Sequence, residues 1–182
     1  FSEIYGLNDI VIEIGITPNR QDCLGVKGIA RDLASAGMGE LLERKISREK
    51  GSFKSPIKIE IQDNKICSAF AGRYFRNVKN TESPEWLKNK LKSIGLRPIS
   101  ALVDITNFVM YDENRPLHVY DADKIDGKII VRSANDGESF LALDEKDYHL
   151  KNGMCVIADE KKVLGLGGIM GGESTGCSTE TK

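Results

Sequence analysis

The hydrophobic positions at the start of the chain change from a strand pattern to a helix pattern. Residues 9–15, DIVIEIG, place isoleucine at every second position, which predicts a strand with one buried face. A turn is predicted over residues 17–20, TPNR, because proline favours turns. A helix is predicted from about Asp22, and Gly37 stands where its C-terminal cap is expected. The apolar residues with helical spacing are Val26, Ile29, Ala30 and Leu33.

A polar segment follows this helix and precedes two predicted strands. Residues 43–56, ERKISREKGSFKSP, predict an exposed connection, which is the best candidate for a boundary or an insertion point. Regular alternation over residues 57–62, IKIEIQ, predicts a half-buried strand. Residues 69–78, AFAGRYFRNV, predict a second strand, since aromatic residues favour extended structure.

Two more helices are predicted in the middle of the chain. Ser83 and Pro84 form a favourable helix start, because proline at the first helical position gives up only an N–H that has no helical partner. Gly95 ends this helix, and another is predicted over residues 100–111. The residues expected to face inward are Leu87, Leu91 and Ile94 in the first of these helices and Leu102, Ile105 and Val109 in the second.

The C-terminal part of the chain is rich in short strand patterns separated by turn residues. Strands are predicted over residues 128–134, 139–144, 147–150 and 154–159, and the tail over residues 163–178 is dense in glycine. Strands and helices are mixed without a regular βαβ order. The predicted class is therefore α+β, with mixed or antiparallel sheets and three main helices.

Length, charge and hydropathy exclude several functional classes. The 182 residues suit one domain or two small ones. No apolar run is long enough to cross a bilayer, and the start lacks the pattern of a signal peptide. The 26 basic and 27 acidic residues give a net charge of −1, which argues against a strong grip on a phosphate backbone by this chain alone.

The cysteines point to an intracellular protein. None of them pairs in a CxxC motif, and no histidine lies at ligand spacing from them, so a zinc site and a disulfide scaffold are both disfavoured. Reduced thiols in a cytosol fit this pattern best. The cysteines are Cys23, Cys67, Cys155 and Cys177.

The glycine-dense tail has two interpretations. It is neither a dinucleotide fingerprint, because Met170 stands at the third glycine position, nor a P-loop, because no Gly-Lys-Ser/Thr follows. The glycines either form a tight bend inside a sheet or line a pocket that a larger side chain would fill. They are Gly165, Gly167, Gly168, Gly171 and Gly172.

Polar residues in and after the last predicted helix are the other candidates for function. Asp104 and Asn107, in the stretch DITN, share one helical face, where they either meet water or line a cleft. His118 is either a hydrogen-bonded structural residue or an acid–base or water-orienting group, because imidazole titrates near neutral pH. His149 is expected on the surface of a strand.

Three long, ordered segments carry a family resemblance: GITPNRQDCLGVKGIARDLASAG, GLRPISALVDITNFVMYDENRPLHVYDADKIDGKIIVR and VIADEKKVLGLGGIMGGES. They closely resemble the editing module, formed by the third and fourth domains, of the bacterial phenylalanyl-tRNA synthetase beta chain. The resemblance runs from about residue 8 to residue 182 and is weakest over residues 43–56. Because that beta chain is several times longer, residues 1–182 are expected to be a single editing-module fragment without the C-terminal part of the fourth domain.

The resemblance implies a function in translation. The whole synthetase is an α2β2 assembly that uses ATP and Mg²⁺ to join phenylalanine to tRNA(Phe) in the cytoplasm, with the aminoacylation site on the alpha chain. The module hydrolyses tyrosine that has been attached wrongly to this tRNA. The implied partners are the alpha chain, tRNA(Phe) and its tyrosine or phenylalanine moiety, with no DNA, membrane or metal site. The isolated fragment is expected to be inactive.

The resemblance also implies the site residues. His118 is the expected catalytic residue, which orients the terminal adenosine, the ester or the water. The implied pocket residues are Arg97, Thr106, Asn107, Pro116, Gly171 and Gly172. The family's acidic residue that recognises the tyrosine hydroxyl is expected beyond the GGES segment and beyond Lys182.

One difference from the family and two other functions stay open. Asp112 and Glu113 stand where the family usually has apolar residues. The module is alternatively a non-catalytic structural and tRNA-docking part of the same subunit. A third interpretation is a free-standing relative that clears mischarged tRNA.

Overall fold

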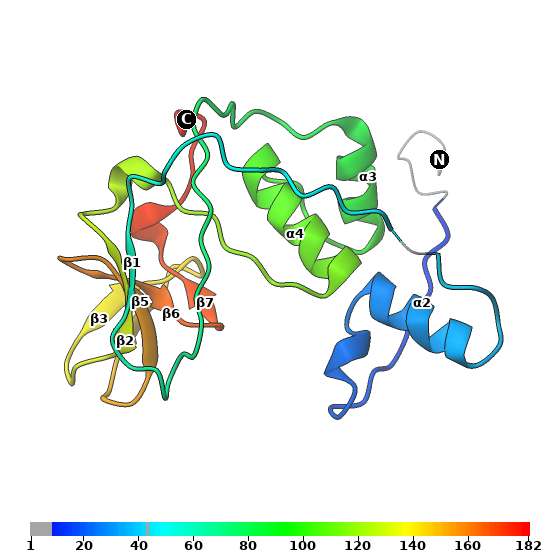
Figure 1. Cartoon of the computed structure of the whole chain (residues 1–182), viewed down its shortest axis with the longest axis horizontal. Coiled ribbons are helices and arrows are strands. Elements are labelled where there is room, and N and C mark those ends of the chain that lie inside the picture. The colour runs from blue at the N-terminus through cyan, green and yellow to red at the C-terminus, as the bar shows by residue number, and fades with distance from the viewer. Residues whose placement is uncertain (1–8, 43) are drawn as a thin grey trace. The chain divides into compact units, whose positions relative to one another are not determined.

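The computed structural model describes residues 9–42 and 44–182, so Glu43 of the predicted connection and the residues before Asp9 lie outside the described residues. The chain divides into two compact units (Figure 1). The first, here called the helical unit, is formed by Phe1–Glu49 and Asn80–Val119. The second, called the β unit, is formed by Lys50–Lys79 and Tyr120–Lys182. The chain passes between them inside the polar segment 43–56 and twice more.

Three α-helices and a short 3-10 helix form the regular structure in the described part of the helical unit (Figure 1). These elements are η1 (Gln21–Cys23), α2 (Val26–Ser35), α3 (Glu85–Ser93) and α4 (Ala101–Glu113). All three predicted helices are confirmed. Gly37 has a φ of 76°, and the amide of Met38 donates to the carbonyl of Leu33 at 3.0 Å, so the predicted cap ends α2 in the expected way.

The buried faces of α3 agree only partly with the prediction. Leu87 and Leu91 are 2% and 1% exposed, as expected for inward positions. Ile94 is wrong as an inward residue, because it is the C-terminal cap of α3 and remains 42% exposed. Gly95 follows it with a φ of 80°, a left-handed backbone that glycine adopts without strain.

The motif around η1 is a structural network. The Arg20 guanidinium donates to the carboxylates of both Asp22 and Asp32. Arg31 also pairs with Asp22, so η1 and α2 are joined by charged hydrogen bonds. A Cβ on Gly28 would lie 1.9 Å from the carbonyl oxygen of Asp22, so only glycine permits this close approach. Within the helical unit, these motif residues therefore fix local structure.

The strand predicted over residues 9–15 is wrong. These residues form no regular structure, and Ile10 and Ile12 are 88% and 74% exposed. A strand requires a hydrogen-bonding neighbour, and the described part of the helical unit contains no strand. The alternating pattern alone was therefore insufficient.

The β unit contains a mixed five-stranded sheet and a separate two-stranded hairpin (Figure 1). The sheet order is β1-β2-β5-β6-β7, with β1 parallel to β2 and the other neighbours antiparallel. The hairpin pairs β3 with β4. The strands are β1 (Ile59–Ile61), β2 (Ile129–Ser133), β3 (Ser139–Leu141), β4 (Asp147–His149), β5 (Cys155–Ala158), β6 (Val163–Leu166) and β7 (Met170–Gly171). Short 3-10 helices occur at η2 (Ala122–Lys124) and η3 (Glu173–Thr175).

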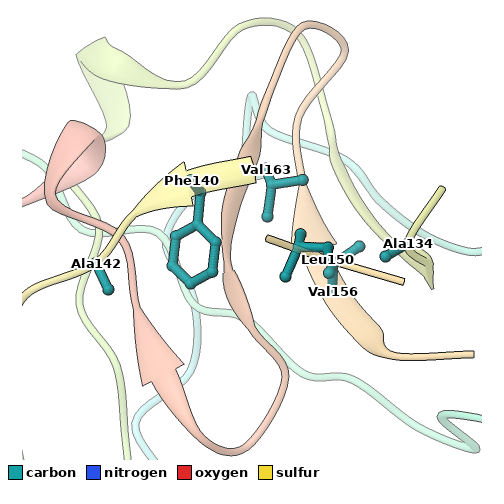
Figure 2. Close-up of a cluster of buried hydrophobic side chains, with 6 residues drawn as sticks. All are labelled: Ala134, Phe140, Ala142, Leu150, Val156 and Val163. Carbon is teal, nitrogen blue, oxygen red and sulfur yellow. The ribbon is translucent and has the colours of Figure 1, made fainter. Parts of the chain in front are cut away.

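One hydrophobic core lies between the hairpin and the sheet of the β unit. Its labelled side chains come from β3, β5 and β6 and from the residues that directly follow β2, β3 and β4, and the Phe140 ring is the largest of them (Figure 2). Phe140 also stacks on Tyr148 across the hairpin, with ring centroids 5.8 Å apart. The core residues are Ala134, Phe140, Ala142, Leu150, Val156 and Val163.

Local sequence pattern predicted β1 to β5 correctly, but it missed β6 and β7 in the glycine-dense tail and predicted one strand that does not form. Residues 69–78 form no strand. Asn77 has a φ of 59°, outside the extended region, and the Tyr74 ring before it contacts the Phe53 ring instead of a neighbouring strand. The observed class is α+β with mixed and antiparallel sheets, as predicted. No helix among the described residues combines the length and the apolar character needed to span a membrane.

Candidate functional site

The N-terminus of α4 is held by a buried polar network. Asp104 is 1% exposed, and its carboxylate accepts hydrogen bonds from the Ser83 hydroxyl at 2.6 Å and the Ile99 amide at 2.8 Å. The side-chain oxygen of Asn80 accepts from the amide of Leu102 at 3.1 Å, which satisfies one N–H of the first helical turn. Asp104 is therefore a structural residue of α4 and is not exposed to water or to a cleft.

The middle of α4 carries two of the predicted pocket residues. Thr106 and Asn107 are both half-buried. The Thr106 hydroxyl donates to the carbonyl of Val103 at 2.7 Å, a common use of threonine inside a helix. The predicted inward position of Ile105 is wrong, since this residue is 49% exposed. The face toward α3 instead carries Phe108, whose ring meets that of Trp86 edge-on at 5.5 Å.

The remaining predicted residues of the helical unit lie on the two segments that flank α4. Arg97 is exposed in the connection between α3 and α4, and Pro116 and His118 are exposed after α4. Asn114 ends the helix with a φ of 53°, in the left-handed region that turns the chain. The predicted site residues of the helical unit therefore lie before, on and after α4.

The surroundings of His118 favour the neutral form of its imidazole. Although its side chain is exposed on the surface, partial desolvation by neighbouring atoms lowers the pKa of the imidazole below the ordinary value of 6.5. A neutral imidazole has one nitrogen that donates and one that accepts a hydrogen bond. It can therefore accept a hydrogen bond from a water molecule or a ribose hydroxyl.

The acidic residues Asp112 and Glu113 form ion pairs at the C-terminus of α4. Glu113 accepts from Lys27 at 2.7 Å, and Arg44 donates to Asp112 and Glu113 at 2.8 Å and 3.0 Å. Asn114 donates from its side-chain amide to the carbonyl of Gln21 at 2.6 Å. The two carboxylates therefore connect α4 to α2 and to the segment around Arg44. An open hollow of ≈ 610 Å³ adjoins them, and its lining includes Lys27, Arg44, Val109, Glu113 and Arg115.

The glycine run builds the β6–β7 turn of the β unit. Gly168 has a φ of 73°, and Gly165 faces Gly171 across the two strands. A Cβ on Gly172 would lie 2.6 Å from the carbonyl oxygen of Leu164 and 3.3 Å from the Phe140 ring. The sheet-bend interpretation is therefore correct for Gly172, whose missing side chain is required by packing.

Gly171 has a different environment from its neighbour. It lies at the end of β7, and its carbonyl accepts from the amide of Leu143 at 3.0 Å. Its role as a pocket wall stays a prediction. The predicted site residues thus divide between the two units, with Gly171 and Gly172 in the β unit and the other five in the helical unit. His149 is an exposed residue of β4, as expected.

A second group of side chains was not singled out from the sequence. It occupies an open hollow of ≈ 340 Å³ in the β unit, formed by two irregular segments around Phe53 and Tyr74. These two rings meet edge-on with centroids 6.0 Å apart, and the Arg76 guanidinium lies 4.2 Å from the centre of the Phe53 ring. The available signal was the pair of aromatic residues flanked by two arginines over residues 73–76, RYFR.

The described residues offer few ligands for a metal ion. All four cysteines are free thiols, and burial raises the pKa of Cys23, which lies beside the Arg20 network. Among residues 9–42 and 44–182, no three His, Cys, Asp or Glu side chains gather closely enough to hold a metal. The predicted site residues Thr106, Asn107, Arg97 and His118 carry hydroxyl, amide, guanidinium and imidazole groups, respectively.

Comparison with known proteins identifies the class of this α+β fold. Residues 66–182 match the family described as the B3/4 domain, and the chain belongs to that family. The match includes α3, α4 and every strand after β1.

The relatives are aminoacyl-tRNA synthetase subunits. Over 181 residues the chain is 55% identical to the phenylalanine–tRNA ligase beta subunit of Bradyrhizobium diazoefficiens. This alignment covers 100% of the chain and 23% of that protein. The chain is 54% identical over 176 residues to the corresponding subunit of Rhodopseudomonas palustris, covering 97% of this chain and 22% of that protein. The chain thus spans less than a quarter of the length of the relatives it matches. The resemblance to the beta chain is confirmed.

A solved structure also aligns with the chain. It is an N-terminal fragment of the phenylalanyl-tRNA synthetase beta-subunit from Pyrococcus horikoshii, and the alignment covers 97% of this chain and 56% of that one. The two sequences are 19% identical, and the TM-score is 0.47.

Proposed function

We propose that this chain is the editing module of a phenylalanyl-tRNA synthetase beta subunit and that it hydrolyses tyrosine attached wrongly to tRNA(Phe). The observation that carries the proposal is its similarity, over the whole of its length, to bacterial beta subunits. The implied pocket residues that fall within this chain include Thr106, Asn107 and His118, which lie on or beside α4 and outside the buried network of Asp104. Thr106, Asn107 and His118 stay partly or largely accessible.

Editing is needed because the two amino acids differ by one hydroxyl group. An apolar synthetic site rejects an added hydroxyl only by roughly 10²-fold. A second site can recognise that hydroxyl with hydrogen-bonding groups. Phenylalanine would leave those groups unpaired at a cost of about 1–3 kcal/mol. Hydrolysis would therefore be selective for the tyrosyl ester.

The proposed reaction is hydrolysis of an ester. A water oxygen adds to the ester carbonyl carbon, and the bond between this carbon and the ribose oxygen breaks. A proton passes to that ribose oxygen, which yields free tyrosine and intact tRNA. His118, in the neutral form of its imidazole, accepts a hydrogen bond from the water or the ribose hydroxyl and so orients it. Asn107 and Arg97 supply donors for the ester and the nucleotide.

The rest of the proposal concerns the whole subunit. The partners are the alpha chain in an α2β2 assembly, tRNA(Phe) and the amino acid that it carries, in the cytoplasm. ATP and Mg²⁺ belong to the aminoacylation site of the alpha chain and take no part in the proposed hydrolysis. The fragment is proposed to need the remainder of the subunit for activity.

The proposal is tested by measuring misacylation with the assembled synthetase. Tyrosine, ATP and tRNA(Phe) are supplied, and Tyr-tRNA(Phe) is quantified over time. Variants His118→Ala and Gly171→Trp should accumulate the mischarged tRNA, while the wild type should not. His149→Ala is the matched control, because it removes the other exposed histidine from a strand of the β unit. If both variants accumulate no more Tyr-tRNA(Phe) than the control, the module is a tRNA-docking part without editing activity.

A further inference from the structure

The hollow around Phe53 and Tyr74 is formed by two basic segments of the chain. Residues 50–58 contain three lysines and residues 65–79 contain two lysines and two arginines, and neither segment contains an acidic residue. This local excess is hidden by the balanced charge of the whole chain. Both segments belong to the β unit, where they line the same hollow.

The aromatic rings of this hollow make it more than a charged surface. Phe75 is 63% exposed, and Arg73 lies 5.8 Å from the centre of its ring. Phe53 is 37% exposed, and its ring contacts the Arg76 guanidinium. Stacking on a ring fixes the plane of a guanidinium group while its N–H edge stays available for an anion. Within the described residues of the β unit, no carboxylate forms an ion pair with Arg76 or Lys54.

These features fit one class of ligand better than others. A free phosphate or an acidic peptide would use the cations but would leave the exposed rings without a partner. An unpaired stretch of RNA uses both, because its phosphates pair with Lys and Arg while its bases stack on aromatic side chains. The two segments lack helix and strand, so they offer an irregular surface that matches a flexible single strand.

We propose that the surface formed by residues 50–55 and 72–76 binds an unpaired stretch of RNA, with phosphates on Arg76 and Lys54 and a base stacked on Phe75. The proposal rests on the proposed function only for the name of the RNA, the tRNA of the synthetase. It adds a contact outside the editing residues. The binding of RNA at this surface does not require that the module hydrolyse anything.

The test measures binding of tRNA(Phe) to the assembled synthetase by fluorescence anisotropy over a series of salt concentrations. Phe75→Ala should raise the Kd about 5-fold or more, the effect of losing one base stack. Arg76→Gln should raise the Kd and reduce the slope of log K against log salt by about 0.7, the value for one phosphate contact on a single strand. Lys151→Gln, an exposed lysine of the β unit outside this surface, is the control and should change neither quantity.

The same variants separate this proposal from the editing proposal. At saturating tRNA, Arg76→Gln and Phe75→Ala should hydrolyse Tyr-tRNA(Phe) at the wild-type rate, whereas His118→Ala should bind normally and hydrolyse slowly. Unchanged Kd and salt slope in Phe75→Ala and Arg76→Gln would overturn the RNA surface, whatever His118→Ala does. Weakened α2β2 assembly with unchanged tRNA affinity would also overturn it, because the surface would then serve an acidic protein partner.

Discussion

The hydroxyl of Ser83 donates a 2.6 Å hydrogen bond to the carboxylate of Asp104, and both side chains are buried. Ser83 precedes Pro84, the N-cap residue of α3, so this bond joins the start of α3 to the first turn of α4. It assigns a structural role to the first residue of the DITN stretch, while Thr106 and Asn107 remain accessible on the same helix. One short motif thus holds both a support for the helix and candidates for the site.

Replacing Asp104 should therefore destabilise the helical unit. In Asp104→Asn, one of the two donors, the Ser83 hydroxyl or the Ile99 amide, would face an amide N–H₂ group. The expected loss is about 1–3 kcal/mol of unfolding free energy, the cost of an unsatisfied buried group. Urea unfolding checks it. Asp112→Asn is the control on the same helix, and its surface ion pair should contribute about 0–1 kcal/mol. Equal losses would contradict the structural role.

A methyl group at Gly172 should not be tolerated. Its carbon would lie 2.6 Å from the carbonyl oxygen of Leu164, where backbone atoms would have to move. We expect Gly172→Ala to lower the stability of the β unit by about 1–3 kcal/mol, as overpacking does elsewhere. Thermal unfolding provides the measurement. Gly39→Ala is the control, because its added carbon would meet nothing within 4 Å. A neutral Gly172→Ala would show that the glycine has no packing role.

The ion pair between Arg132 and Glu138 should make stability depend on pH. Two hydrogen bonds from Arg132 at 2.7 Å and 2.9 Å, with further bonds from Asn135, lower the pKa of Glu138 to about 2. Because the folded pKa lies below the unfolded value, the stabilisation is complete above pH 4.5 and is lost as the pH falls toward 2.

Glu138→Gln tests this dependence. The Glu138 side chain is 25% exposed, so solvent screening reduces the effect to about 1–2 kcal/mol at neutral pH. The difference in unfolding free energy between wild type and variant should shrink when urea unfolding is repeated in acid. Glu180→Gln, at an exposed position, should show no such difference. A constant difference across this pH range would contradict the assigned cause.

The lowered pKa of His118 predicts the acid limit of editing. The neutral imidazole is the form that accepts a hydrogen bond. Desolvation lowers its pKa below 6.5, so the neutral form persists to a lower pH. The rate of Tyr-tRNA(Phe) hydrolysis should stay constant around neutral pH and fall in acid with an inflection below 6.5. In His118→Ala this inflection should disappear. A rate that rises as the pH falls would mean that the protonated imidazole is the working form.

Local sequence pattern predicted the helices correctly, because the backbone hydrogen bonds of a helix form within the same segment. The periodicity of Leu87 and Leu91 and the glycine after each helix were sufficient for α2 and α3. The alternation of residues 9–15 was equally regular, yet no strand formed, because a strand depends on a neighbour that its own sequence does not specify. Residues 69–78 failed for the same reason.

The candidate site was predicted from family motifs, whereas the ion pairs of Glu113 and the basic aromatic surface became visible only in the folded structure. The role of Glu113 depends on Lys27 and Arg44, which lie far from it in the sequence. The net charge of −1 disfavoured a phosphate-binding surface, but it averages the acid-free segments 50–58 and 65–79 with acidic ones elsewhere. The contacts of Phe53 with Tyr74 and Arg76 show that these segments meet.

The most direct test of the editing site is the single-turnover hydrolysis of preformed Tyr-tRNA(Phe) and Phe-tRNA(Phe) by the assembled synthetase. The wild type and His149→Ala should hydrolyse the tyrosyl ester much faster than the phenylalanyl ester. His118→Ala should lose about 10²-fold or more of the tyrosyl rate, the usual contribution of a positioned acid–base group, without a change in tRNA affinity. A tyrosyl rate in His118→Ala equal to that of His149→Ala would contradict the account.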